Sequence, residues 1–148
     1  MRDDEARAAL AAMGSANANL ADAMACPPWR HAAFGVLMAS LVLAVTVPPT
    51  WLVPIQIGSL AGMIWLLRHD RKRFGVFVNG YRRGRTLPVT LGLLTAELGI
   101  VFLALPTRHL PFPSPRGLAC VAGAFVLATA ASVLFQRVWI AEIRGGKA

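Results

Sequence analysis

Long runs of apolar residues alternate with short polar segments along this chain. The runs cover Ala32–Val47, Trp51–Leu67, Leu87–Leu105 and Gly117–Phe135, with few polar residues or none in each. A helix of about 17–25 apolar residues spans the hydrocarbon core of a bilayer, and each run reaches or nearly reaches that length. A backbone in hydrocarbon finds no water for its hydrogen bonds, so runs of this length must be helical. The pattern predicts an all-α fold, a four-helix transmembrane bundle.

The segments around the runs are too short to bury a second core. We therefore expect an N-terminal cytoplasmic helix over residues 1–26 and one membrane domain over residues 27–148. The composition agrees, because 56% hydrophobic and 15% charged residues are typical of a membrane domain. The expected spans are approximately residues 32–47, 51–67, 87–105 and 117–138.

Positive charge is distributed unevenly among the connections. Residues 68–86 hold seven lysines and arginines, opposed only by Asp70, whereas the connection between the first two runs holds none. The third connection holds only Arg108 and Arg116. Short loops rich in lysine and arginine stay in the cytoplasm, so we expect this loop and both termini to be cytoplasmic. The same placement explains the net charge of +8 without nucleic acid.

The segment Asp3–Ala25 is typical of an alanine-rich amphipathic helix with acidic residues at its N-terminal end. Its larger side chains have heptad spacing with one polar position, a pattern found in coiled coils. Docking of this helix on the membrane surface or on the basic loop is favoured over self-pairing. Two prolines at 27 and 28 then end the helix before the first span. The heptad positions are Leu10, Met13, Asn17, Leu20 and Met24.

Small residues indicate where the spans pack. The second span carries a GxxxG pattern at Gly58 and Gly62, and the third has Gly92, Ala96 and Gly99 on one face. Packing within one chain is favoured, and a homodimer is the alternative.

We expect Pro54 and Pro88 in the first turns of their helices, where a missing amide costs little. The proline-rich connection over residues 106–115 is expected to be extended.

Glu97 lies near the middle of the third run, where a carboxylate costs about 2.5–3.5 kcal/mol and needs a partner, water or a proton. The rise per residue puts Ser40 nearly level with it and Gln56 a few ångströms nearer the outside. We therefore favour a structural polar cluster of Glu97, Gln56 and Ser40. The alternatives are a proton- or cation-coupled transport site and a lipid-facing protonated glutamate.

The loop after the second span joins arginines to an apolar middle that contains aromatic residues. Such a segment lies in the membrane interface with its cations on lipid phosphates, so we expect an anionic-lipid patch. A plain topology signal is the favoured alternative, and a nucleic-acid site needs a groove that this loop is too short to form. The patch residues are Arg71, Lys72, Arg73, Arg82, Arg83 and Arg85.

The chain shows no pattern of a catalytic or metal centre. His31 and His69 are expected on one side of the membrane and His109 on the other, so they cannot share a metal. We therefore expect no enzyme, no catalytic residue, no metal and no cofactor. The favoured function is a non-enzymatic membrane protein that acts through an unknown protein partner or a homo-oligomer. A small transporter that uses Glu97 is the alternative.

Two short motifs carry a resemblance to a known group of proteins. They read PPWRH at Pro27–His31 and GVFVNGYRRGRT at Gly75–Thr86. With them the chain resembles uncharacterised small bacterial four-span integral membrane proteins. The resemblance implies the bacterial cytoplasmic (inner) membrane and no activity that can be carried over. It further implies that the two motifs form one unit at the cytoplasmic face.

Overall fold

The chain is described by a computed structural model that covers residues 3–23, 26–74 and 85–144. Within these residues it forms five α-helices, one 3-10 helix and no strand, which confirms the all-α prediction. In chain order the elements are α1 (Asp3–Ala23), α2 (Pro28–Thr46), α3 (Pro49–Phe74), α4 (Leu87–Ala104), η1 (Leu105–His109) and α5 (Pro115–Arg144).

Four helical stretches are long and apolar enough to cross a membrane. Each overlaps one of the four predicted runs, so the number and order of the predicted spans are confirmed. The chain is accordingly a multi-pass membrane protein by the length and composition of its helices. The stretches are Pro28–Thr46, Pro49–Lys72, Leu87–His109 and Pro115–Glu142.

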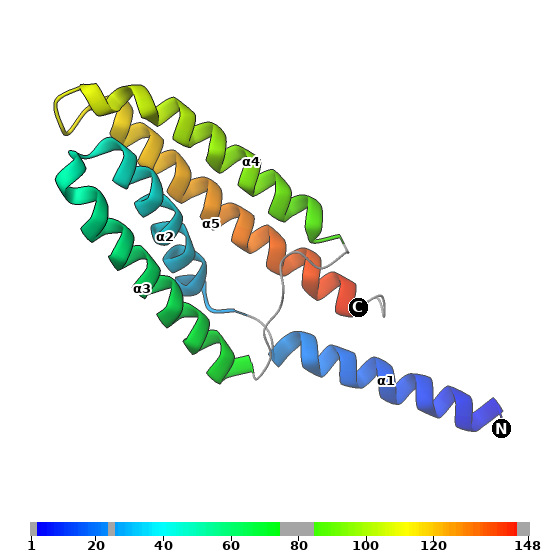
Figure 1. Ribbon diagram of the computed structural model, residues 1–148. Helices are drawn as coiled ribbons and strands as arrows, with labels where there is room; N and C mark the ends of the chain where they lie inside the picture. The colour runs from blue at the N-terminus through cyan, green and yellow to red at the C-terminus, as the bar shows by residue number, and fades with distance from the viewer. Residues whose placement is uncertain (1–2, 24–25, 75–84, 145–148) are drawn as a thin grey trace.

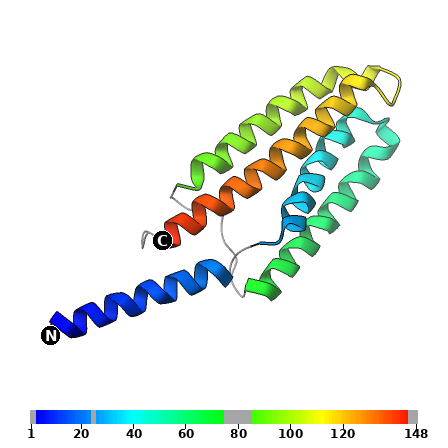
Figure 2. The same ribbon diagram turned by 180° about the vertical axis from the view of Figure 1, so that it is seen from behind.

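The helices are arranged around a central pair. α2 and α5 lie side by side, α3 packs mainly against α2, and α4 packs against α5 and α2 (Figures 1 and 2). α1 points away from the bundle and contacts α5. We use the term basic end for the end where α2 and α4 begin and α3 and α5 finish. The opposite end, which holds η1 and the turn between α2 and α3, is the hairpin end.

The core is built from small side chains where α2, α4 and α5 meet. Val42, Ala104 and Ala124 have no exposed surface, and half-buried apolar residues of α4 and α5 surround them. Small residues allow membrane helices to approach closely, which gains the van der Waals contact that holds such bundles together. Towards the basic end, Gly35 of α2 lies so close to α5 that an added Cβ would be 2.1 Å from Thr129 Oγ1.

Prolines lie at the starts of helices and once inside a helix, with three departures from prediction. α2 begins at Pro28 after an extended Pro27, whereas the first span was predicted to begin near residue 32. α3 begins at Pro49, so Pro54 lies inside the helix rather than in its first turn. Residues 105–109 form η1 instead of an extended loop, because the Thr107 hydroxyl donates to Ala104 O at 2.6 Å and stabilises the turn.

Some of the small residues pack against a neighbouring helix, whereas others lie next to open space. A Cβ at Gly62 would lie 2.7 Å from Leu37 Cδ2, so this glycine packs against α2 within the chain. Gly58, its partner in the GxxxG pattern, has nothing within 4 Å of such a Cβ, and the same holds for Gly92 and Gly99 of α4. The predicted packing face of the third span therefore has its two glycines next to open space.

Candidate functional site

Glu97 lies in the middle of α4, on the side that packs into the bundle. Its side chain is buried, with 5% exposure, and it is two turns away from the buried Ala104 on the same face. Within the part of the chain that the structure describes, its Oε1 atom has no hydrogen-bond partner. A buried polar group without a partner costs about 1–3 kcal/mol, so this carboxyl group calls for an explanation.

Ser40, one member of the predicted cluster of Glu97, Gln56 and Ser40, makes hydrogen bonds to residues outside that cluster. The Ser40 hydroxyl lies 2.7 Å from Ser59 Oγ and donates to Leu37 O at 2.6 Å. Gln56 lies half-buried on α3, one turn before Ser59. Ser40 of α2 therefore makes its side-chain contact with α3, the helix that packs mainly against α2. The Glu97 Oε1 atom is not a partner in these hydrogen bonds.

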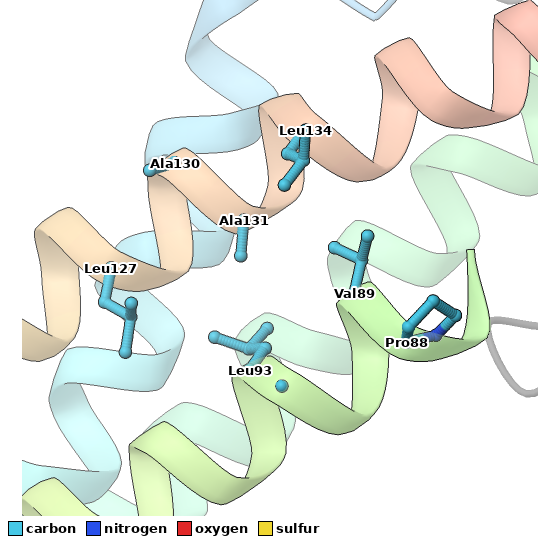
Figure 3. Close-up of a pocket in the computed structure, with 8 residues that line it drawn as sticks. Pro88, Val89, Leu93, Leu127, Ala130, Ala131 and Leu134 are labelled. Carbon is cyan, nitrogen blue, oxygen red and sulfur yellow. The ribbon is translucent and has the colours of Figure 1, made fainter. Parts of the chain in front are cut away.

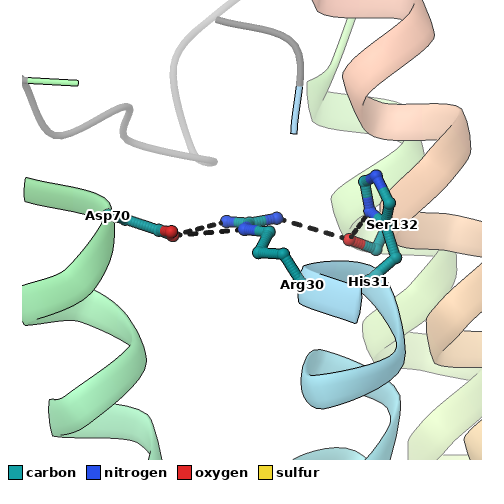
Figure 4. Close-up of polar contacts among 4 residues, drawn as sticks. All are labelled: Arg30, His31, Asp70 and Ser132. Carbon is teal, nitrogen blue, oxygen red and sulfur yellow. Dashed lines mark hydrogen bonds and ion pairs between the residues drawn. The ribbon is translucent and has the colours of Figure 1, made fainter. Parts of the chain in front are cut away.

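A polar cluster at the basic end joins three helices (Figure 4). Arg30 of α2 donates from Nε and Nη2 to Asp70 Oδ2 of α3, at 3.2 and 2.8 Å. Its Nη1 donates to Ser132 Oγ of α5 at 3.4 Å, and His31 Nδ1 lies 2.8 Å from the same oxygen. The two side chains of the ion pair are only 27% and 18% exposed, so water screens them less than an ordinary surface pair.

Aromatic side chains support the ion pair from the neighbouring turn. Trp29 lies 6.2 Å from Trp65 and 5.1 Å from His69, measured between ring centroids. Trp65 and His69 stack with their centroids 5.7 Å apart. The start of α2 is therefore fixed to the last turns of α3 by rings as well as by charge. Amphipathic rings of this kind are typical of the membrane–water interface.

The predicted anionic-lipid patch lies partly outside the described residues. Arg71 and Lys72 at the end of α3 are exposed, as is Arg85 before α4. The Arg85 backbone N–H donates to the Glu142 carboxylate, which joins the start of α4 to the end of α5. The Arg73 side chain, Arg82 and Arg83 lie outside the described set, as does most of the second motif, residues 75–84.

Two adjoining cavities lie between helices near the basic end. The first, of about 490 Å³, opens between α4 and α5 and has apolar walls (Figure 3). The second, of about 220 Å³, lies between α2, α4 and α5 and includes Arg30 and Ser132 in its wall. Val89, Leu93 and Ala131 line both. A third cavity, of about 510 Å³, lies between α2 and α5 and has Ala122 in its wall.

The arrangement has no parallel in the comparisons with known proteins. Known protein families, curated proteins and solved structures all gave no match. The resemblance to small four-span bacterial proteins, based on two short motifs, therefore stays a prediction. The function has to be argued from the geometry of the described residues.

Neither the role of Ser132 nor the partner of Asp70 was predicted from the sequence. Asp70 carried a signal, since it is a single acid among seven cations at the end of a span, where an ion pair is the usual way to hold it. Ser132 carried none, because membrane helices commonly contain serine. Among the described residues no group of three histidines, cysteines or acids is placed to hold a metal ion.

Proposed function

We propose that the chain is a non-enzymatic membrane protein that acts by lateral binding to a second copy of itself or to another membrane protein. The observation that carries this proposal is the outer face of α3. α3 packs mainly against α2, and a stripe along its other side is 50–63% exposed. The stripe residues are Val53, Ile57, Leu60 and Ile64.

Gly58 gives α3 a second feature, on a different side of the helix from the stripe, that lipid contact does not require. Lipid chains are as apolar as leucine, so helices associate in a bilayer by close backbone packing rather than by the hydrophobic effect. An added Cβ at Gly58 would meet nothing within 4 Å, whereas Gly62 one turn later is used in packing against α2. Gly58 thus leaves backbone accessible on an exposed part of α3, which favours contact with another helix.

A pair of matched glycine variants tests the proposal. Gly58 of α3 and Gly99 of α4 both have open space where a side chain would go, so leucine at either position leaves the bundle intact. Single-molecule photobleaching in vesicles counts the chains in each particle. We expect particles with more than one chain for the wild type and for Gly99→Leu, and single chains for Gly58→Leu. Equal counts in all three would reject self-association through α3.

The proposal includes an orientation with both termini cytoplasmic in the bacterial inner membrane. The unequal charge of the connections supports it: the basic end carries Arg68, Arg71 and Lys72, and the hairpin end carries only Arg108 and Arg116 among the described residues. In this orientation the basic end faces the anionic inner leaflet, so anionic lipid headgroups are its expected partners.

A second function, coupled transport through Glu97, is supported by one observation. The carboxyl group is buried in the middle of a membrane helix, and one of its oxygens has no partner among the described residues; ionisable groups at such a position commonly serve transport. Glu97 does not line any of the three cavities described above. A proton-gradient-driven uptake or efflux assay distinguishes the functions: Glu97→Gln abolishes coupled transport but leaves lateral association unchanged.

A further inference from the structure

The cavity of about 220 Å³ is lined by both polar and apolar residues. Arg30, Thr90 and Ser132 are polar, whereas Phe34 and Leu93, about one helical turn further from the basic end than Arg30 and Thr90, are apolar. Three helices contribute to it, and a ligand inside would therefore contact α2, α4 and α5 together. An amphipathic molecule with a charged head and an apolar chain matches this division.

The guanidinium group of Arg30 is held in place and keeps donors for a ligand. Asp70 occupies Nε and Nη2 with one carboxylate oxygen, which fixes the plane of the group from the α3 side. Among the described residues, the contact that Nη1 makes is a long one of 3.4 Å with Ser132 Oγ, although Nη1 carries two N–H donors. A fixed guanidinium with remaining donors is well suited to bind a phosphate.

We propose that this cavity is a binding site for an anionic phospholipid. The lipid phosphate binds Arg30 Nη1 and the Ser132 hydroxyl, and an acyl chain runs deeper into the bundle along Phe34 and Leu93. Charge supports this ligand, since the exposed cations Arg68, Arg71, Lys72 and Arg85 surround the same end of the bundle.

The adjoining apolar cavity of Figure 3 supports a ligand with two chains. It shares Val89, Leu93 and Ala131 with the first cavity and has apolar walls, so a second acyl chain finds a place next to the first. The proposed lipid site rests on the proposal that the helices lie in the membrane with the basic end at the anionic leaflet. It does not require lateral association through α3, so an experiment can refute either proposal without refuting the other.

Native mass spectrometry of the detergent-purified chain tests the site with two probes, phosphatidylglycerol and the zwitterionic phosphatidylcholine. Arg30→Gln removes the cavity cation, and Arg68→Gln removes one exposed cation from the same end as a matched control. Loss of a charged hydrogen bond predicts about tenfold weaker phosphatidylglycerol binding for Arg30→Gln. Binding by Arg68→Gln should stay within about twofold of the wild type, because exposed charges are screened.

A second pair of variants leaves the Arg30–Asp70 ion pair untouched. Ala131→Val narrows the proposed site, and Ala122→Val adds the same two methyl groups to the third cavity. We expect weaker phosphatidylglycerol binding for Ala131→Val only, and this pair decides the question if Arg30→Gln does not fold. Inorganic phosphate at millimolar concentration should not displace the lipid. Equal effects within either pair of folded variants, no preference for phosphatidylglycerol, or displacement by phosphate would overturn the proposal.

Discussion

Gly35 is the position where the packing of α2 on α5 allows the least change. A Cβ added there would lie 2.1 Å from Thr129 Oγ1, 2.9 Å from Phe125 O and 3.1 Å from Phe125 Cδ2. The first two separations are far shorter than van der Waals contact, and one of them involves a backbone atom that cannot rotate away. Gly35→Ala therefore forces the central helix pair apart.

The loss in the free energy of unfolding depends on which of these neighbouring atoms can move away from the new Cβ. Overpacking a well-packed core typically costs about 1–3 kcal/mol, and the fixed carbonyl oxygen puts Gly35→Ala at the upper end, about 2–3 kcal/mol. Thr129→Ala removes the closest atom and also a buried hydroxyl that has no hydrogen-bond partner among the described residues. The double variant should therefore recover part of the loss but not all of it, since Phe125 O remains.

Reversible denaturation of the purified chain in mixed micelles, followed by circular dichroism, measures these differences. Gly123→Ala is the matched control, because it also adds one methyl group to the central pair but meets nothing within 4 Å. A double-mutant cycle between positions 35 and 129 isolates their interaction. If Gly35→Ala were as stable as Gly123→Ala, the close approach of α2 and α5 described above would be refuted.

Three further outcomes are expected. Asp70→Asn should lower the free energy of unfolding by about 1–2 kcal/mol in the same assay, because the half-buried guanidinium loses a charged acceptor, whereas Arg68→Gln should change it little. Glu97→Gln should change stability by less than about 1 kcal/mol, since Oε1 has no hydrogen bond to lose in the described structure; a larger loss would show a partner. Reporter fusions at the C-terminus and in the 106–116 connection should be active on the cytoplasmic and external sides respectively, and the opposite result would reverse the orientation.

The helices of the fold could be predicted from the sequence because each depends on local features of the chain. The length of an apolar run acts locally, so the number and order of the four spans could be predicted from residue types alone, although α2 begins at Pro28, before the predicted start near residue 32. η1 departs from the prediction because the hydrogen bond from Thr107 to Ala104 O outweighs the tendency of prolines towards extended structure.

The candidate site was harder to predict because depth along a helix does not determine direction around it. Ser40 was placed at the depth of Glu97, yet it faces α3 and bonds Ser59, which the rise per residue could not indicate. Similarly, Gly58 and Gly62 share one motif but only Gly62 packs within the chain. Which helix is neighbour to which depends on the sum of many weak contacts, and no single residue in the sequence encodes it.

The pairing of α2 with α5 has a consequence for biogenesis, because it joins the first of the four described spans with the fourth. A nascent chain that has reached the end of α4 offers α2 its contacts with α3 and α4 but none with α5. At that stage Gly35 has no facing helix, and His31 has not yet met Ser132. The spans enter the bilayer one after another, but the central contact forms only after α5 has been synthesised. A chain truncated before α5 therefore lacks both the central helix pair and one of the three helices that form the core.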